Sequence, residues 1–232
     1  MLQKYGTVDN FPLANYYTER FDNDRVCNFL PFKLMEMNCE KKPKLIIDCG
    51  YEGQDLTMKK LLYAQFNQVY SHVKKAHSLL PIGFSSTKSA LRLPDPIINL
   101  NGSGLISITD QDFSTLCEDY KEIVYLSPHS DRVLHEINSN TAYIIGGLVD
   151  IHQNLPYSIA RARKFKVKTA ALPLDIYFNW EKGSKSLTID QMIKIMYTLW
   201  ETGSWYDALS FVPQRKATPT RALLDLKSKA KT

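Results

Sequence analysis

YIIGGLVD, residues 143–150, is the stretch that decides the fold of this chain. Together with Ala142, its first residues form an unbroken run of apolar, mostly β-branched or aromatic side chains, as expected of a central parallel strand covered on both faces. Gly146 and Gly147 then remove two side chains, which lets a turn or a ligand approach the backbone. Asp150 follows, at the end of a strand where open α/β sheets bind ligands. These residues alone fit a catalytic carboxylate, or a structural turn in which Asp150 makes a local hydrogen bond.

Strands and helices alternate around this stretch. Short apolar runs predict further strands at residues 45–48, 81–84, 122–126 and 167–172. An apolar stripe with helical spacing follows Thr57, which we expect to be the N-cap of a helix carrying Leu62, Phe66, Val69 and Val73. Other helices are expected at residues 132–137, 159–165 and 188–202, the last with a Thr188 and Gln191 capping box and a stop at Gly203, and Ser204 caps a short helix after it.

This alternation predicts an α/β fold with a mostly parallel sheet and helices on both faces. We expect residues 1–43 to be an N-terminal arm, residues 44–212 one domain, and residues 213–232 a basic C-terminal tail. Residues 92–103 contain two prolines, two asparagines and a glycine, which favours a loop. The chain has 232 residues, of which 44% are hydrophobic, and this supports one sizeable globular core.

Positive charge is concentrated in two places. The net charge is +5, and the tail carries six basic residues against the single acid Asp225. A second basic cluster contains Arg161, Arg163, Lys164, Lys166 and Lys168. Two basic patches near a candidate site indicate a polyanionic partner, with nucleic acid as the first choice. The alternative is that each run is a solvated helix face.

Several classes of protein are excluded or unsupported by the sequence. The four cysteines and five histidines show no zinc-site spacing, and the cysteines fit a reducing intracellular compartment, so no metal is expected. No apolar run approaches the roughly 20 residues of a membrane span. The sequence contains no GxGxxG, GxxxxGK[ST] or GxSxG motif. Residues 1–25 lack the character of a transit peptide, so an imported protein would have its signal upstream of this chain.

Four strings together carry a resemblance to a known family. They are YIIGGLVD, TAALPLD at residues 169–175, LTIDQMIKI at 187–195 and WYDALSFVPQRK at 205–216. With them, residues 44–216 resemble the SPOUT-class tRNA methyltransferases that modify N1 of the purine at position nine. The wording of residues 172–192 and 211–216 is most similar to the metazoan mitochondrial branch of that family.

The resemblance implies a SPOUT fold whose C-terminal part forms a trefoil knot, a rare exception to unthreaded topology. It also implies S-adenosyl-L-methionine as the cofactor, bound by loops at the strand ends, and a monomeric catalytic unit. The positions that match the family's cofactor-binding residues are Leu126, Ser127, Gly146, Gly147, Leu148, Thr169, Leu172, Leu174 and Thr188.

By the same resemblance, Asp150 is the catalytic carboxylate. Guanine N1 carries a proton that must leave as the methyl group arrives, and adenine N1 gains a positive charge, so a carboxylate serves either purine. The positions implied for tRNA binding are Gln65, Asp190, Arg161, Arg163, Lys164, Arg215 and Lys216. Gln65 could instead be an ordinary surface glutamine. The basic residues would contact tRNA phosphates.

The mitochondrial branch further implies a role in ribonuclease P, which processes pre-tRNA 5′ ends with a short-chain dehydrogenase subunit and an endonuclease subunit. A mitochondrial location follows from this. Only a short arm precedes residue 44, whereas mitochondrial members carry a longer N-terminal extension. Two alternatives remain, a tRNA-binding scaffold without catalysis and a stand-alone cytosolic enzyme that methylates guanine at position nine.

Overall fold

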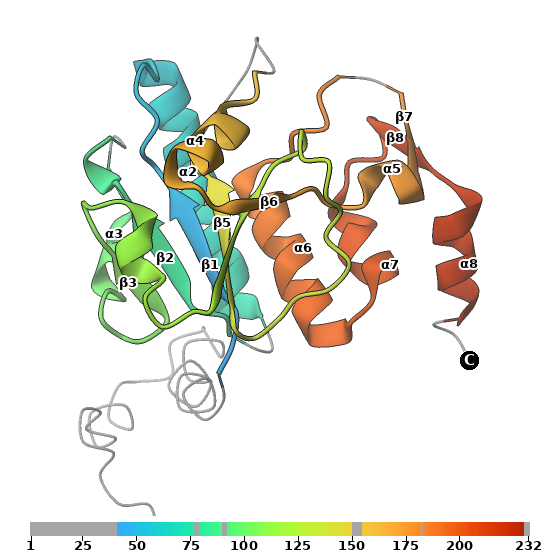
Figure 1. Ribbon diagram of the computed structural model, residues 1–232, viewed down its shortest axis with the longest axis horizontal. Coiled ribbons are helices and arrows are strands. Elements are labelled where there is room, and N and C mark those ends of the chain that lie inside the picture. The colour runs from blue at the N-terminus through green and yellow to red at the C-terminus, as the bar shows by residue number, and fades with distance from the viewer. Residues whose placement is uncertain (1–40, 77–78, 90–91, 150–154, 182, 230–232) are drawn as a thin grey trace, which may run out of the picture.

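A parallel six-stranded sheet forms the centre of the molecule (Figure 1). The computed structural model describes residues 41–76, 79–89, 92–149, 155–181 and 183–229. The order of the strands across the sheet is β3-β2-β1-β5-β4-β6, and each neighbouring pair is parallel. In chain order they are β1 Lys44–Asp48, β2 Ile82–Ser85, β3 Ile106–Ile108, β4 Glu122–Leu126, β5 Thr141–Gly146 and β6 Lys168–Ala170. The predicted parallel sheet is confirmed.

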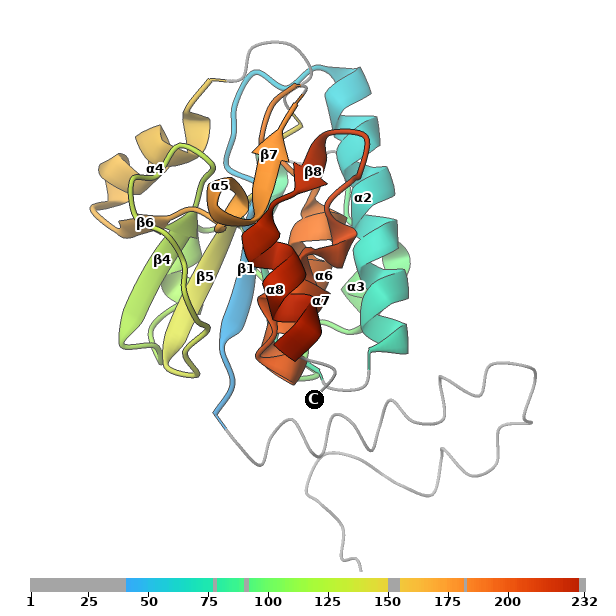
Figure 2. The same cartoon turned by 90° about the vertical axis from the view of Figure 1, so that its right-hand side faces the viewer.

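Helices cover both faces of this sheet, as predicted (Figure 2). Alternate residues of the central strand β5 enter two separate apolar clusters because successive side chains of a strand point to opposite faces. Tyr143 and Ile145 pack with helices α2 (Leu56–Lys75) and α6 (Ile189–Thr202). Ala142 and Ile144 pack with helix α4 (Tyr157–Phe165) and the short helix η5 (Phe113–Leu116). A strand buried on both faces explains the unbroken apolar run in the sequence.

Helix α2 buries the stripe that its sequence predicts. Leu62, Phe66, Val69 and Val73 are its buried residues. The predicted N-cap was wrong, because Asp55 rather than Thr57 caps the helix. The Asp55 carboxylate accepts a hydrogen bond of 2.7 Å from the Met58 backbone N–H. Asp and Thr are both good N-caps, and periodicity alone does not place a helix end within two residues.

Helix α6 packs against α2 and follows the sequence signals at both ends. Thr188 is its N-cap, and the Gln191 side chain accepts a hydrogen bond of 3.0 Å from the Thr188 backbone N–H. Gly203 ends the helix with φ 65°, a left-handed conformation that glycine adopts without strain. The next helix, α7 (Trp205–Ala208), is capped by Ser204 as predicted, because the Ser204 hydroxyl accepts from the Asp207 N–H.

The helix expected at residues 132–137 is absent from the structure. This segment runs beside the end of β6, where Val133 forms a bridge with Ala171. The Ala171 N–H donates to the Arg132 carbonyl at 2.7 Å, and the Leu134 N–H donates to the Ala171 carbonyl at 2.8 Å. These pairings to a distant strand use the backbone groups that a local helix would need. Conversely, the expected loop at residues 92–103 contains a short helix, α3 (Asp95–Asn99).

The C-terminal part adds a small two-stranded sheet and a final helix to one side of the six-stranded sheet (Figure 1). Strands β7 (Phe178–Trp180) and β8 (Ala217–Pro219) form an antiparallel pair. Helix α8 (Arg221–Lys229) packs against α5 (Leu174–Tyr177) and α7, and its Leu223 is buried. The short helices η4 (Thr87–Ser89) and η6 (Leu209–Phe211) complete the described elements. The trefoil knot stays a prediction.

Candidate functional site

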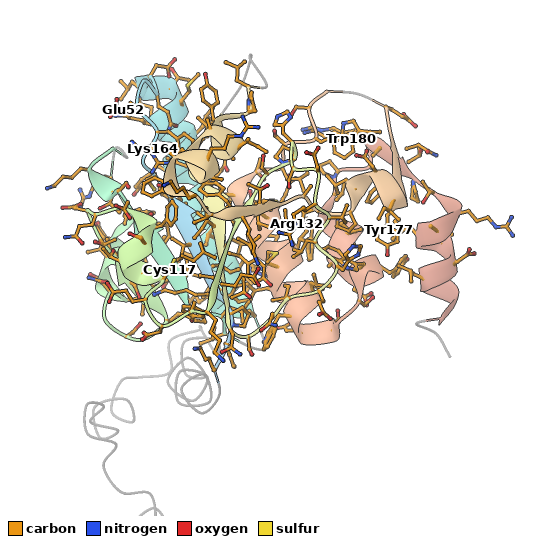
Figure 3. The ribbon with its side chains drawn as sticks, in the orientation of Figure 1. Glu52, Cys117, Arg132, Lys164, Tyr177 and Trp180 are labelled. Atoms are coloured by element: carbon orange, nitrogen blue, oxygen red, sulfur yellow. The ribbon has the colours of Figure 1, made fainter. Side chains whose placement is uncertain are left out.

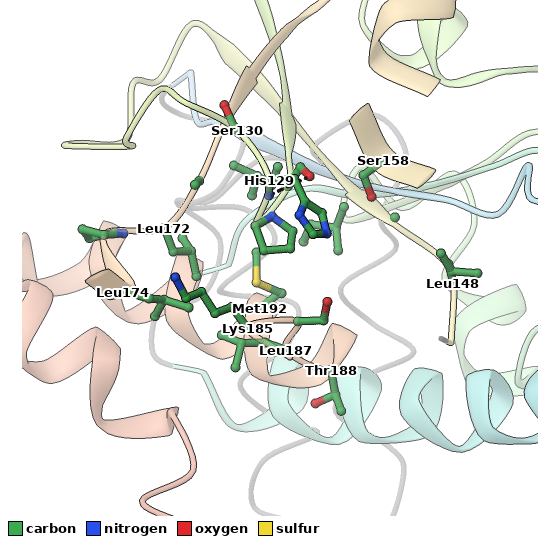
Figure 4. Close-up of a pocket in the computed structure, with 18 of the residues that line it drawn as sticks. His129, Ser130, Leu148, Ser158, Leu172, Leu174, Lys185, Leu187, Thr188 and Met192 are labelled. Atoms are coloured by element: carbon green, nitrogen blue, oxygen red, sulfur yellow. Dashed lines mark hydrogen bonds between the residues drawn. The ribbon is translucent and has the colours of Figure 1, made fainter. Parts of the chain in front are cut away.

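A cavity of about 340 Å³ opens where three neighbouring strands of the sheet end (Figure 4). One wall is formed by residues 126–130 at the end of β4, a second by Gly146, Leu148 and Val149 after β5, and a third by residues 171–176 after β6. Helix α6 closes the cavity with its N-cap Thr188 and with Met192. Parallel strands bring their carboxyl ends to one edge, so the loops that leave them converge. The volume falls in the range of small-molecule sites.

Most of the predicted cofactor positions gather around this cavity. Seven of the nine contribute to its lining, namely Leu126, Ser127, Gly146, Leu148, Leu172, Leu174 and Thr188. Gly147 and Thr169 lie outside the lining. The Thr169 hydroxyl is 2.9 Å from the Ser130 hydroxyl, so it supports the wall that follows β4. The assignment of these positions to a cofactor stays a prediction.

The two adjacent glycines have different structural reasons. A Cβ atom on Gly146 would lie 2.7 Å from the Tyr51 hydroxyl and 3.0 Å from the Ser158 hydroxyl. A Cβ atom on Gly147 would lie 2.8 Å from the Asp48 carbonyl oxygen. The Gly147 N–H donates to that same oxygen at 2.8 Å, and the Gly147 carbonyl accepts from the Gln54 amide at 3.2 Å. Gly147 therefore allows the backbone of the turn after β5 to approach the backbone of β1 at Asp48. Gly146 borders the cavity.

Gln65 and Asp190 both lie at the N-terminus of α6. The Gln65 side chain lines the cavity and accepts a hydrogen bond of 2.8 Å from the Ile189 N–H, which joins α2 to α6. Asp190 is buried and lies outside the lining. It accepts from the Thr188 hydroxyl at 2.6 Å and from Lys194 at 3.3 Å. A carboxylate in the first turn is also stabilised by the helix dipole.

The predicted RNA-binding cations are in different environments. Arg163, Lys164 and Arg215 are exposed, and Figure 3 labels Lys164 on α4. Lys216 lines the cavity, and its ammonium donates to the carbonyls of Ser184 at 3.2 Å and Ser186 at 3.1 Å. Burial lowers the pKa of Lys216, and the neighbouring charge of Arg215 lowers it further. Arg163, Lys164 and Arg215 are thus accessible from solvent, although Lys164 also lies 5.9 Å from the centre of the Phe165 ring.

Arg161 differs from the other cations, because the structure uses it inside the protein. Its guanidinium donates to the Asp48 carboxylate from Nε at 2.5 Å and from Nη2 at 2.9 Å, and Nη1 donates to the Gly50 carbonyl at 2.5 Å. Only 16% of its side chain is exposed. This ion pair joins Arg161 to a residue that lies 113 positions away in the sequence, and a contact of Arg161 with a phosphate stays a prediction.

Asp48 is the centre of a buried polar network that the sequence did not reveal. Its side chain is fully buried and also accepts from the Tyr125 hydroxyl at 2.9 Å. The Tyr125 and Tyr51 hydroxyls are 2.7 Å apart, and the Tyr51 hydroxyl is 3.4 Å from the Ser158 hydroxyl. Burial raises the pKa of Tyr51 to about 12 and the pKa of Tyr125 well above its ordinary value, so both hydroxyls keep their protons at neutral pH. The only signal in the sequence was a carboxylate that ends the apolar run of β1.

Other side chains line the cavity without having been predicted. Figure 4 labels His129, Ser130, Ser158, Lys185 and Met192 among them. Lys185 forms an ion pair of 2.5 Å with Asp175, and both side chains border the cavity. The Ser127-Pro128 strand stop marked the segment that holds His129 and Ser130. Lys185 lies in a polar loop where spacing carries no signal.

The predicted catalytic residue Asp150 lies outside the described residues. Within the described ranges, no cluster of three His, Cys, Asp or Glu side chains is arranged to hold a metal ion. Cys49 and Cys117 are buried free thiols. The described helices include none with the length and apolar character needed to cross a membrane.

Comparison with known proteins gives the family. The family model of tRNA (guanine(9)-N(1))-methyltransferase TRM10/TRM10A matches residues 22–217. The mitochondrial ribonuclease P protein 1 homolog of Drosophila melanogaster is 32% identical over 182 residues, which are 75% of this chain and 40% of that protein. The tRNA methyltransferase 10 homolog C of Xenopus tropicalis is 47% identical over 96 residues, 41% of this chain and 21% of that protein. The chain thus matches less than half of the length of these relatives.

Solved structures support the same fold. The spTrm10 structure in complex with SAH has a TM-score of 0.59 at 22% identity, and it covers 75% of this chain and 95% of its own. A dual specific Trm10 from Thermococcus kodakaraensis has a TM-score of 0.54 at 18% identity, over 74% of this chain and all of its own. At such low identity these likenesses show the SPOUT fold alone. The extent of the family-model match settles the classification: this chain belongs to the tRNA (guanine(9)-N(1))-methyltransferase TRM10/TRM10A family.

Proposed function

We propose that this protein is an S-adenosyl-L-methionine-dependent tRNA methyltransferase that modifies N1 of the purine at position nine. The observation that carries the proposal is the cavity at the ends of β4, β5 and β6, where seven positions with the family's cofactor-binding wording converge. Membership of the family supplies the substrate class. The spTrm10 relative was solved with SAH, the product form of this cofactor.

The cavity suits such a cofactor in size and in chemistry. Leu126, Leu148 and Leu172 offer apolar surface for a purine ring, and Ser127 and Thr188 offer hydroxyl groups. Small-molecule sites commonly combine mostly apolar walls with a few polar groups in this way. When bound, the cofactor supplies an electrophilic methyl group on a sulfonium. Gly146 makes room for Tyr51 beside the cavity wall, since a side chain at this position would collide with the Tyr51 hydroxyl.

Asp150 is the residue that we assign to the chemistry. It follows Val149, which lines the cavity, by one position in the sequence. With guanine as substrate, the Asp150 carboxylate would accept the N1 proton, and the bound cofactor would supply the methyl group that replaces this proton. With adenine, N1 has no proton and the product is cationic, so the carboxylate stabilises the developing charge. One side chain can therefore serve both purines.

The exposed cations supply affinity for the tRNA backbone. Arg163, Lys164 and Arg215 stand on the surface and are free to meet phosphates, and Lys216 borders the cavity itself. Contacts of this kind make affinity fall with salt and carry no base specificity. Gln65, whose amide nitrogen is not used by the hydrogen bond to Ile189, is the candidate for a contact to the target base.

The family's mitochondrial branch provides the assembly that we propose. In it the protein acts in the matrix as a subunit of ribonuclease P, with a short-chain dehydrogenase subunit and an endonuclease subunit, and its own catalytic unit is monomeric. The support is the name of the Drosophila relative, mitochondrial ribonuclease P protein 1 homolog. Co-purification of the two partners from a mitochondrial extract tests this assembly, and a protein found outside mitochondria would contradict it.

Primer extension across position nine tests the activity. Transcripts with G or A at that position are incubated with S-adenosyl-L-methionine and either wild type or Asp150→Asn, because N1 methylation blocks the polymerase. We expect a stop at position nine with wild type and its loss with the variant. Equal stops with both proteins would refute the role of Asp150. Tight tRNA binding without methylation, with the partners present, would favour the non-catalytic scaffold.

A further inference from the structure

Behind the cavity lies an ion pair that neither cofactor binding nor RNA binding explains. Asp48 ends strand β1 and is fully buried, and Arg161 sits on α4 with 16% of its side chain exposed. Neither residue belongs to the lining of the cavity. A buried ion pair is costly to desolvate and is often no more stabilising than an apolar replacement. Its presence beside a binding site therefore calls for another reason.

The Asp48 carboxylate is already saturated with donors. Its two oxygens accept from the Tyr125 hydroxyl at 2.9 Å, from the Gly50 N–H at 3.0 Å and from two nitrogens of Arg161 at 2.5 and 2.9 Å. Four donors satisfy the lone pairs of a carboxylate. All of its acceptor positions are therefore used inside the protein, and the pair fixes the positions of the groups that donate to it.

The pair connects two walls of the cavity. On one side, the Asp48 carbonyl accepts from the Gly147 N–H at 2.8 Å, which holds the turn after β5. On the other side, Arg161 lies three residues after Ser158, so both project from one face of α4, and Ser158 lines the cavity. One residue of β1 is therefore bonded to both the Gly146 wall and the Ser158 wall.

Tyr51 fills the space between these walls. Its hydroxyl lies within 2.7 Å of Tyr125 and 3.4 Å of Ser158, and the absent side chain of Gly146 leaves room for it. The Arg161 guanidinium stands 5.3 Å from the centre of the Tyr51 ring and the same distance from the Phe165 ring. A lysine could make a cation–π contact here, but it lacks the planar guanidinium that also donates to Asp48 and to the Gly50 carbonyl.

We propose that Asp48 and Arg161 are positioning residues for the cofactor pocket. The pair sets the separation between the turn after β5 and helix α4, and Tyr51 transmits that separation to Gly146 and Ser158 at the cavity wall. This proposal rests on one part of the proposed function, namely that the cavity binds S-adenosyl-L-methionine or SAH. Supporting groups behind metal sites typically contribute about 10- to 100-fold in affinity or activity, and we expect a similar contribution here.

Calorimetric titration with SAH tests the proposal without any RNA. The single variant Arg161→Gln leaves a buried carboxylate unpaired and can unfold the protein. The decisive variant is therefore the double change Asp48→Asn with Arg161→Gln, which removes both charges at once. Glu122→Gln is the matched control, because it breaks the exposed pair between Glu122 and Lys168 on the same sheet.

The two explanations of the pair predict different results. Positioning predicts that the double variant melts within a few degrees of wild type and binds SAH at least tenfold more weakly, while Glu122→Gln binds like wild type. A role in stability alone predicts a lower melting temperature and an unchanged dissociation constant for the folded fraction. A folded double variant that binds SAH within twofold of wild type would overturn the proposal.

The same titration separates this proposal from the proposed function. If wild type binds SAH and the double variant binds it tenfold more weakly, but no tRNA is methylated, then the positioning role stands and the tRNA assignment fails. If wild type itself does not bind SAH, both are refuted.

Discussion

Two ion pairs support the walls of the same cavity and have the same N–O distance of 2.5 Å, yet their surroundings differ. Arg161 and Asp48 have side-chain exposures of 16% and 0%, whereas Lys185 and Asp175 have exposures of 38% and 73%. The first pair joins the sheet to α4, and the second joins a surface loop to the short helix α5. Equal distances therefore conceal unequal environments.

The difference in exposure determines how much free energy is needed to separate each pair. Removing either member of the buried pair leaves a charge without solvent, so that pair stays closed while the protein is folded. The exposed pair is screened by water and salt, and its separation costs little. Separating Lys185 from Asp175 therefore costs little free energy, whereas separating Arg161 from Asp48 costs much more.

The largest expected effect is on stability at the buried pair. Arg161→Gln should lower the free energy of unfolding by about 3–5 kcal/mol, since it strands the Asp48 carboxylate in the core. Urea denaturation followed by circular dichroism measures this loss. A loss below about 1 kcal/mol would place Arg161 in the same class as Lys185 and remove the contrast between the two pairs.

The second prediction sharpens the role of the backbone beside the buried pair. Gly147→Ala should cost about 1–3 kcal/mol, because its Cβ would lie 2.8 Å from the Asp48 carbonyl oxygen, which belongs to a fixed strand. Gly146→Ala should cost less, because its Cβ would meet the end of the Tyr51 side chain, which can shift. The two variants are compared in the same denaturant titration, and the reverse order would contradict this assignment.

The third prediction concerns alkaline pH. Burial raises the pKa of Tyr51 to about 12, above the value of about 10 expected in the unfolded chain. Between these values the folded state binds more protons, so the stabilising contribution is complete below pH 10 and is lost as the pH rises through 12. Tyr51→Phe should lose less stability between pH 9 and 11 than wild type does. Melting curves across this range measure the effect, and parallel slopes for the two proteins would disprove it.

The smallest effect on stability is expected at the exposed pair of Lys185 and Asp175. Lys185→Gln should change the free energy of unfolding by less than about 1 kcal/mol, because the pair with Asp175 is exposed. Any difference from wild type should vanish in 1 M salt, where charges are screened within about 3 Å. A loss as large as that of Arg161→Gln, or one that persists in high salt, would show that exposure does not separate the two pairs.

The sequence predicted the centre of the fold well because the central strands have one simple physical signature. β1, β4 and β5 are buried on both faces, and an unbroken apolar run marks such strands. The prediction of a helix at residues 132–137 was wrong because the conformation of this segment depends on a distant residue. Ala171 forms backbone hydrogen bonds with Arg132 and Leu134, and no local pattern indicates them. Three-residue strands such as β3, β7 and β8 are too short for any periodicity to appear.

The candidate site divides in the same way. Strand ends marked by Gly146 or by the Ser127-Pro128 stop could be placed from the sequence, because the carboxyl ends of parallel strands meet at one edge. The ion pair between Asp48 and Arg161 could not be predicted from the sequence, because the two residues are 113 positions apart. In the sequence, Arg161 is one member of a basic run. The reason for Gly147 was also hidden, because it depends on how closely β1 approaches the turn after β5.

Filling the cavity at the ends of β4, β5 and β6 tests whether this cavity binds the cofactor. Met192 lines it from α6, as Figure 4 shows, so Met192→Trp should occupy the space and Met192→Leu should preserve it. The measurement is the dissociation constant for SAH by calorimetry, with folding of each variant checked by circular dichroism. We predict wild-type affinity for Met192→Leu and no detectable binding for a folded Met192→Trp. Equal SAH affinity in all three proteins would contradict the account.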